Sequence, residues 1–278
     1  MRFIKNIAID AAVICLAFFS FSFALQYSGL FQQQDFMPAQ QYIQNIQNFI
    51  NPGVQTSVSE TLNDADTAAA VTMVKPSVVS IFGTETTQGP TPFTVFSKVD
   101  AGTGFFIDPN GYILTNKHVV ANQDATYTVQ LSNGKKKAAQ VVYRDLTNDL
   151  AVVKIAGSNY PVLNLADSSK LKVGQAVIGL GNAYGKNPNT VSSGTISGLH
   201  KKVLAINSSS EMGDQELKNV IQSTAQLYPG DSGGPLFDSD GNVVGVNVAI
   251  AAEKDNVSFS IPINDALSVI QAAKNGQF

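Results

Sequence analysis

The pattern of hydrophobic and polar positions divides the chain into three regions. Residues 7–25 are almost continuously apolar, and Asp10 is their only charged member. Residues 26–64 are rich in Gln and Asn and read as a linker. From residue 65 onward, short apolar runs alternate with turn residues, which is typical of a globular domain. We therefore expect one folded domain over 65–278.

Short strands are the predicted building blocks of this domain, which makes it all-β. Runs rich in Val, Ile and Thr are separated by turns that contain Gly, Asn and Asp. The predicted strands are 78–82, 104–107, 112–115, 126–131, 138–143, 150–155, 176–179, 191–197, 220–223, 235–237, 243–248 and 258–261. A short helix is expected at 68–74, and a second, C-terminal helix is expected to begin at Asn264 as its cap. So many short strands favour a sandwich or barrels, and roughly 210 residues suffice for two packed barrels.

The N-terminal region carries a membrane signal. Two basic residues precede the apolar stretch, and no further Lys or Arg follows before Lys75. A helix needs about 20 apolar residues to span a bilayer, and its basic flank stays in the cytoplasm. We expect a cytoplasmic segment at 1–6, a transmembrane signal anchor at 7–25 and a domain on the periplasmic or extracellular side. A cleaved signal peptide is the alternative, because residues 22–24 (Ser-Phe-Ala) could form a cleavage site.

Composition argues against several kinds of partner and site. The net charge of −3 gives no basic surface for nucleic acid, so no nucleic-acid partner is expected. The single cysteine, Cys15, cannot form an internal disulfide or a cysteine metal site. Two histidines are too few for a multi-histidine metal centre. We therefore expect no metal site built from cysteines or from several histidines.

The segment 229–236, Pro-Gly-Asp-Ser-Gly-Gly-Pro-Leu, has the pattern of an exposed nucleophile. Glycines around Ser232 permit backbone angles that are closed to other residues. Such a loop can turn the N–H groups of Gly230 and Ser232 toward one point, where they would stabilise an oxyanion. A serine is a weak nucleophile on its own and needs a base within hydrogen-bond reach.

His118 is the better of the two candidate bases, because it follows an apolar strand that would hold it rigidly. His200 lies in a Leu-His-Lys-Lys stretch and is expected to be a solvated loop residue. A buried carboxylate must then fix the histidine tautomer. Asp149 opens an apolar strand and suits that task, whereas Asp145, the alternative, suits a turn.

Three segments in this order, 114–120, 148–154 and 229–236, resemble the HtrA/Deg family of trypsin-like serine proteases. The resemblance covers about 71–263 and includes the Gly-Thr-Gly-Phe-Phe-Ile run at 102–107. It implies a chymotrypsin-like double β-barrel with a short C-terminal helix. It also implies that His118 is the general base, Asp149 the orienting acid and Ser232 the nucleophile. The backbone of Gly230, Asp231 and Ser232 would carry the oxyanion hole.

The chain departs from the family pattern in two ways. Asp231 stands where members usually have Asn, so its carboxyl needs a donor, from a loop N–H or a Lys, or else it titrates with pH. Only about fifteen residues follow Ile263, which is too few for another domain, so we expect a form that lacks a PDZ domain.

The substrate pocket is expected to prefer aliphatic side chains. Gln226 lies six residues before Ser232, where digestive trypsin-like enzymes place an acid for Lys or Arg substrates. The resemblance places the pocket lining at Gln226, Leu227, Asn247, Val248, Ala249 and Ile250.

The resemblance implies a membrane-anchored serine endopeptidase that hydrolyses unfolded or damaged exported polypeptides through an acyl-enzyme, without metal or cofactor. It also suggests a homotrimer. Two alternatives stay open. One is a protease-like binding or chaperone module that holds unfolded chains without cutting them, and the other is a regulatory protease with one defined membrane target.

Overall fold

The computed structural model describes residues 63–88, 95–183, 187–205, 215–249 and 257–276. All of them belong to one compact unit, Val58–Phe278. The predicted span at 7–25, almost all of the predicted linker at 26–64, and Ile250 lie outside the described residues. Among the helices that are described, none is both long enough and apolar enough to cross a membrane.

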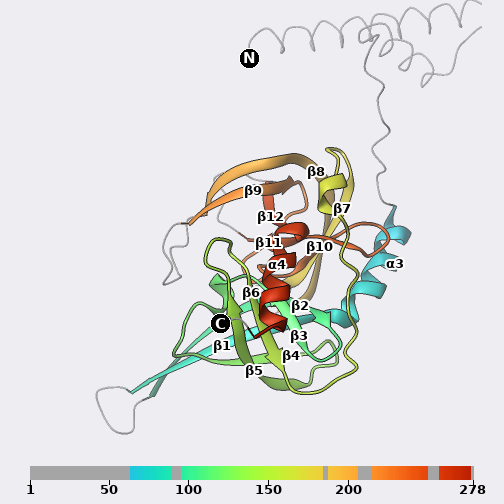
Figure 1. Ribbon diagram of the computed structural model, residues 1–278. Coiled ribbons are helices and arrows are strands. Elements are labelled where there is room, and N and C mark those ends of the chain that lie inside the picture. The colour runs from blue at the N-terminus through green and yellow to red at the C-terminus, as the bar shows by residue number, and fades with distance from the viewer. Residues whose placement is uncertain (1–62, 89–94, 184–186, 206–214, 250–256, 277–278) are drawn as a thin grey trace, which may run out of the picture. The chain divides into compact units, whose positions relative to one another are not determined.

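The described strands form two closed antiparallel barrels, which confirms the predicted double β-barrel (Figure 1). The first barrel has the order β1-β2-β3-β6-β5-β4, with β1 Val78–Gln88, β2 Val95–Asp108, β3 Tyr112–Thr115, β4 Thr126–Gln130, β5 Lys136–Arg144 and β6 Ala151–Ile155. The second has the order β10-β11-β12-β9-β8-β7, with β7 Ala176–Ala183, β8 Asn187–Ala205, β9 Gln215–Ser223, β10 Pro235–Phe237, β11 Val243–Val248 and β12 Ser258–Pro262.

Alternation of side chains explains why these runs form barrel strands. In β4 the side chains of Tyr127 and Val129 are buried, while their neighbours are partly or fully exposed. Every residue of β11 is buried, because one face lines the barrel and the other packs against the rest of the domain. The turns lie where their residues predict them. Gly111, for example, has φ 94°, and a Cβ atom there would come within 2.5 Å of Ile155 O.

The helix α4 (Ile263–Lys274) packs against both barrels, beside β5 and β6 of the first and β11 and β12 of the second (Figure 1). It buries Ile263, Ala266, Val269 and Ala273 in a core cluster that both barrels share. At its end, Lys274 Nζ lies 2.6 Å from Asp108 Oδ2.

Asn264 does not cap this helix, which corrects the prediction. Pro262 occupies the capping position and makes no side-chain bond there. The Asn264 side chain instead accepts from Ser168 N–H at 3.0 Å, and the Asn264 N–H donates to Ser168 Oγ at 3.1 Å. The residue therefore fastens the start of α4 to the 3-10 helix η4 (Ser168–Lys170).

Several elements are longer than their apolar runs predict. Helix α3 (Asp64–Val74) begins after Asn63, whose side chain caps it by accepting a hydrogen bond from Asp66 N–H. The 3-10 helix η2 (Lys75–Ser77), which contains Pro76, follows it directly. Strand β8 spans Asn187–Ala205, well beyond the predicted 191–197, and β1 and β2 pair as far as Gln88 and Val95. In these extensions of β8 and of the β1–β2 pair, backbone pairing continues although the residues are mostly polar and give no strand signal in the sequence.

Candidate active site

The first barrel supplies a tightly held His118–Asp149 pair. His118 begins the 3-10 helix η3 (His118–Val120), three residues after β3 ends, and Asp149 comes just before β6. His118 Nδ1 lies 2.6 Å from Asp149 Oδ2, and the His118 main-chain N–H donates to Asp149 Oδ1 at 2.9 Å. Asp149 is only 2% exposed. Both of its carboxylate oxygens are thus bonded to one residue, which fixes the orientation of the imidazole ring.

The turn before Asp149 is held by its own hydrogen bonds. Asp145 Oδ1 accepts from the main-chain N–H groups of Thr147 and Asn148, which is the turn-capping role expected for it. Asn116 Nδ2 donates to Asp149 O at 2.8 Å. Asp145 is therefore not the histidine's partner, and Asp149 is.

His200 lies away from this pair. It belongs to β8 rather than to a loop, with φ 54°, and its side chain is exposed. Its Nδ1 lies 2.6 Å from Asn219 Oδ1 on β9. The predicted solvent exposure is confirmed, while the loop assignment was wrong because β8 continues past its apolar part.

Ser232 lies in the loop between β9 and β10, in the second barrel, and this loop is tied across to the first barrel. Thr103 on β2 donates its N–H to Ser232 O at 2.8 Å and its hydroxyl to Gly230 O at 2.7 Å. The same hydroxyl accepts from Asn182 N–H on β7 at 2.9 Å. Thr103 is fully buried, so these bonds are shielded from water.

The loop also packs directly against the segment that leads to His118. A Cβ atom at Gly233 would lie 2.3 Å from Thr115 Oγ1 and 3.1 Å from Asn116 N. Gly233 has φ 85°, so glycine is needed both for the backbone angle and for this close approach. The fold therefore brings the serine loop and the His118–Asp149 pair to the junction of the barrels.

The Ser232 hydroxyl is not bonded to His118 in this arrangement. Its Oγ accepts from Ala249 N–H at 3.0 Å. Within the described part of the chain, no hydrogen bond joins Ser232 to His118. The side chain occupies a resting position beside β11.

Two main-chain donors of the loop are available for a ligand. The N–H groups of Gly230 and Ser232 donate to no acceptor among the described residues. The Asp231 N–H, in contrast, donates to Tyr228 O at 2.9 Å within the turn. Gly230 has φ 98°, a conformation that favours glycine.

The Asp231 side chain points away from solvent, beneath this loop. The residue is 2% exposed, and Oδ2 accepts from Tyr228 N–H at 2.9 Å. The other oxygen, Oδ1, is buried and has no hydrogen-bond partner among the described residues. Burial raises the pKa of the Asp231 carboxyl to about 6, although the Tyr228 N–H acts in the opposite direction.

The described residues that were predicted to line a substrate pocket lie in this loop and at the end of β11. Leu227 is half-buried, its N–H donates to Ser258 Oγ at 3.1 Å, and its Cδ2 would lie 3.1 Å from a Cβ at Gly179. Asn247 is fully buried; its Nδ2 donates to Pro235 O and its Oδ1 accepts from Ser260 Oγ, so both polar atoms of its side chain have partners. Val248 is buried, Ala249 bonds Ser232, and Gln226 is exposed.

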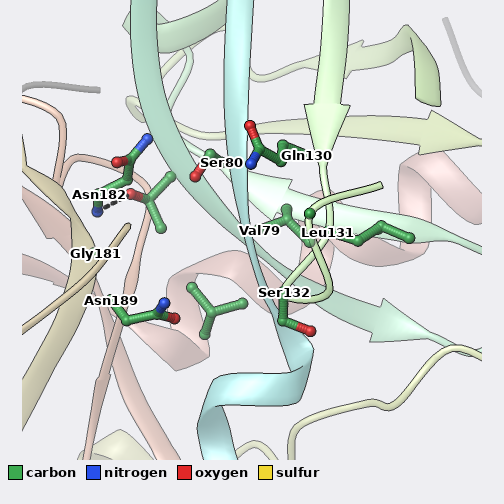
Figure 2. A pocket seen from close by; sticks show the side chains of 11 residues that line it. Val79, Ser80, Gln130, Leu131, Ser132, Gly181, Asn182 and Asn189 are labelled. Carbon is green, nitrogen blue, oxygen red and sulfur yellow. Dashed lines mark hydrogen bonds between the residues drawn. The ribbon is translucent and has the colours of Figure 1, made fainter. Parts of the chain in front are cut away.

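A separate pocket of about 90 Å³ lies between the barrels. Figure 2 shows Ser80 and Gln130 of the first barrel facing Asn182 and Asn189 of the second. No charged side chain lines it, and none of the predicted catalytic residues does. It adjoins the serine loop only through Thr103, Gly181 and Asn182, so we do not take it as the active site.

Thr103 is the residue of this site that sequence reasoning missed. It lies in the Gly-Thr-Gly run that contributed to the resemblance, but a threonine in a strand gives no sign of a bond to a residue 127 positions away.

Among the described residues, no group of three His, Cys, Asp or Glu side chains could hold a metal ion.

Comparison with known proteins identifies the family. A sequence model of the trypsin-like peptidase domain matches residues 102–246. The chain belongs to this family. The match includes His118, Asp149 and Ser232 and both barrels contribute to it.

Relatives of this trypsin-like peptidase domain are HtrA and DegP proteins. The putative serine protease HhoB of Synechocystis sp. is 38% identical over 191 residues, 68% of this chain and 43% of HhoB. The probable periplasmic serine endoprotease DegP-like of Hahella chejuensis is 38% identical over 177 residues, 63% of this chain and 35% of that protein. The chain thus spans less than half the length of these curated relatives.

Solved structures show the same fold. The HtrA-type protease AlgW with decapeptide superposes with a TM-score of 0.65 and 29% identity, covering 76% of this chain and 68% of that one.

Proposed function

We propose that this protein is a serine endopeptidase in which His118, Asp149 and Ser232 form the catalytic triad. The observation that carries the proposal is the 2.6 Å contact between His118 Nδ1 and Asp149 Oδ2, beside a glycine-flanked serine. The two unused N–H groups of Gly230 and Ser232 add the donors that an oxyanion requires.

The proposed reaction begins with attack by Ser232 Oγ on the carbonyl carbon of a peptide bond. Asp149 holds the proton on His118 Nδ1, so Nε2 is free to take the hydroxyl proton. The Gly230 and Ser232 N–H groups stabilise the oxyanion that forms. The C–N bond then breaks, and His118 gives its proton to the leaving amine. Water, activated by His118 in the same way, hydrolyses the acyl-serine ester.

The resting position of Ser232 implies one step before this chemistry. The hydroxyl would have to leave the Ala249 N–H and turn toward His118, and we propose a rotation about χ1 for this step. Bound substrate favours this rotation if its backbone takes over the Ala249 N–H. Peptide binding and completion of the triad are then coupled.

We further propose that substrates are unfolded or damaged polypeptides that bind in extended form. AlgW, a structural relative, has been solved with a decapeptide. The half-buried Leu227 and the uncharged Gln226 support a preference for aliphatic side chains at the cleavage site. Anchoring through residues 7–25, an extracytoplasmic domain and a homotrimer complete the proposal, and the periplasmic naming of a relative supports the location.

Labelling with a fluorophosphonate tests the catalytic proposal directly. The purified full chain should react at Ser232, and Ser232→Ala and His118→Ala should each lose the label. Ser239→Ala, at an exposed turn serine, is the matched control and should label like the parent. Absence of labelling in the parent, or labelling that survives Ser232→Ala, would favour the binding-module alternative.

A cleavage profile on denatured proteins tests the substrate proposal. Aliphatic residues should dominate on the N-terminal side of the cut bonds. Cleavage mainly after Lys or Arg would contradict the proposed pocket. Cleavage of a single membrane protein, with no activity on denatured chains, would favour the regulatory alternative.

A further inference from the structure

We propose that Asp231 is a positioning residue whose carboxyl must be neutral for the Gly230–Ser232 loop to hold its active shape. Ionisation of this carboxyl would release the loop, so the enzyme would work best on the acid side of neutrality. The inference rests on the proposed peptidase function and concerns how its oxyanion site is held.

The position of Asp231 suits a neutral group better than a charged one. One carboxyl oxygen has a single donor, the Tyr228 N–H, and the other has none among the described residues. An ionised carboxylate accepts several hydrogen bonds and loses much free energy when it is buried with only one.

Strand β7 closes one side of the unpaired oxygen. A Cβ atom at Gly181 would lie 2.4 Å from Asp231 Oδ1 and 2.7 Å from Asp231 Cα. The strand β7 is therefore in direct contact with this side of the residue.

The elements around the carboxyl bring no positive charge to it. Strands β7 (AVIGLGNA), β10 (PLF) and β11 (VVGVNV) contain no ionisable side chain, and the Gly102–Gly104 part of β2 contains none. The loop itself contributes Tyr228. Across the junction lie His118 and Asp149, which are paired with each other. Burial without a counter-charge accordingly raises the pKa of Asp231 to about 6.

Movement of Asp231 cannot be separated from the proposed oxyanion site. The two donors, Gly230 N–H and Ser232 N–H, flank this residue directly in the chain. The loop is fixed by Asp231 N–H to Tyr228 O and by Gly234 N–H to Asp231 O, so both its N–H and its carbonyl are used. If the ionised Asp231 side chain moves toward water, these hydrogen bonds change, and the directions of the Gly230 and Ser232 N–H groups change with them.

An amide side chain would have the same shape without the charge. Asp231→Asn offers a carbonyl oxygen to the Tyr228 N–H and cannot ionise. The variant should therefore keep the loop in its active shape at every pH at which the fold survives.

The rate at which a fluorophosphonate modifies Ser232 tests this inference without a chosen substrate. It would be measured between pH 5 and 8.5 on the full chain, for the parent, Asp231→Asn and Asp231→Ser. Asp240→Asn, at an exposed turn carboxylate, is the matched control. Rates for the parent and Asp231→Asn should be equal at pH 5. At pH 7 the variant should react about tenfold faster, because about one parent molecule in ten stays neutral one unit above its pKa.

Each outcome decides between the two levels of the proposal. Parallel pH profiles for the parent and Asp231→Asn would overturn the positioning role. Failure of both neutral variants to fold would overturn it as well, because the carboxylate would then be needed for the structure itself. Lack of labelling in the parent and in the variants at every pH would count against the peptidase function instead.

Discussion

The two barrels hold their buried carboxylates in opposite ways. Asp149, from the first barrel, has both oxygens bonded to His118, one to the ring nitrogen and one to the main chain. Asp231, from the second barrel, has one bond to Tyr228 and an oxygen without a partner among the described residues. Both are only 2% exposed, so the difference lies in hydrogen bonding and not in burial.

This difference assigns separate tasks to the two halves of the site. In the first barrel, the hydrogen bonds between His118 and Asp149 are already formed without a ligand. The second presents a serine whose hydroxyl is bonded elsewhere and a loop whose carboxyl lacks a counter-charge. Control of activity, in this view, belongs to the second barrel.

The largest expected effect comes from disrupting the His118–Asp149 pair of the first barrel. Asp149→Asn keeps the shape of the side chain but should stabilise the wrong histidine tautomer. We expect kcat to fall about 10⁴-fold, measured with a peptide that the parent cleaves. Asp124→Asn, an exposed carboxylate of the same barrel, should leave kcat unchanged. A loss below tenfold for Asp149→Asn would show that the pair does not orient the base.

A smaller effect is expected from cutting the link between the halves. Thr103→Val removes the hydroxyl that donates to Gly230 O and accepts from Asn182 N–H. Leaving two buried groups unpaired should lower the free energy of unfolding by about 1–3 kcal/mol in urea titrations. Labelling of Ser232 should slow by about tenfold or more, since 1.4 kcal/mol of misalignment is enough for that.

Thr103→Ser is the matched control for this link, because it keeps the hydroxyl. It should restore most of the labelling rate. A loss in Thr103→Ser as large as that in Thr103→Val would show that keeping the hydroxyl does not preserve the labelling rate, and it would contradict the role of the hydroxyl link.

The smallest effect concerns a third carboxylate, Asp108, whose partner is the exposed Lys274. Lys274 and an N–H of Asn110 lower the pKa of Asp108, the first by its hydrogen bond and charge. A lowered pKa contributes stability above the ordinary value, near 4, and this contribution disappears as the pH falls through the lowered pKa. Lys274→Met should cost less than about 1 kcal/mol at pH 7, because the Lys274 side chain is exposed to solvent.

The same variant should lose less stability on acidification than the parent, as followed by urea unfolding at pH 7 and pH 3. Lys172→Met, at an exposed lysine outside the proposed catalytic site, is a control for removal of one positive charge. A larger acid sensitivity in Lys274→Met than in the parent would contradict the assignment.

Strand positions were predictable where short apolar runs are bounded by turn residues. The bounds of β3, β10 and β11 match the predicted runs residue for residue. The long arms of β8 and of the β1–β2 pair were not predictable, because their strand structure depends on a partner strand rather than on their own apolar residues.

The candidate triad was likewise accessible from sequence, since His118, Asp149 and Ser232 each lie in a motif with its own chemical logic. The roles of Thr103 and Ala249 were not. Thr103 acts on a loop 127 residues away, and Ala249 N–H bonds a serine 17 residues earlier through the fold alone. Such contacts depend on how two barrels meet, which local patterns do not specify.

The position of helix α4 in the sequence affects how the domain folds during translation. It contacts strands of both barrels and follows them in the sequence, so the ribosome makes it after them. Until α4 has been translated, the surfaces that pack against Ile263, Ala266 and Val269 are exposed to water. The barrels then lack the helix that packs against both of them. The barrel that supplies the proposed base and the barrel that supplies the proposed nucleophile would therefore gain this shared support only after α4 has been translated.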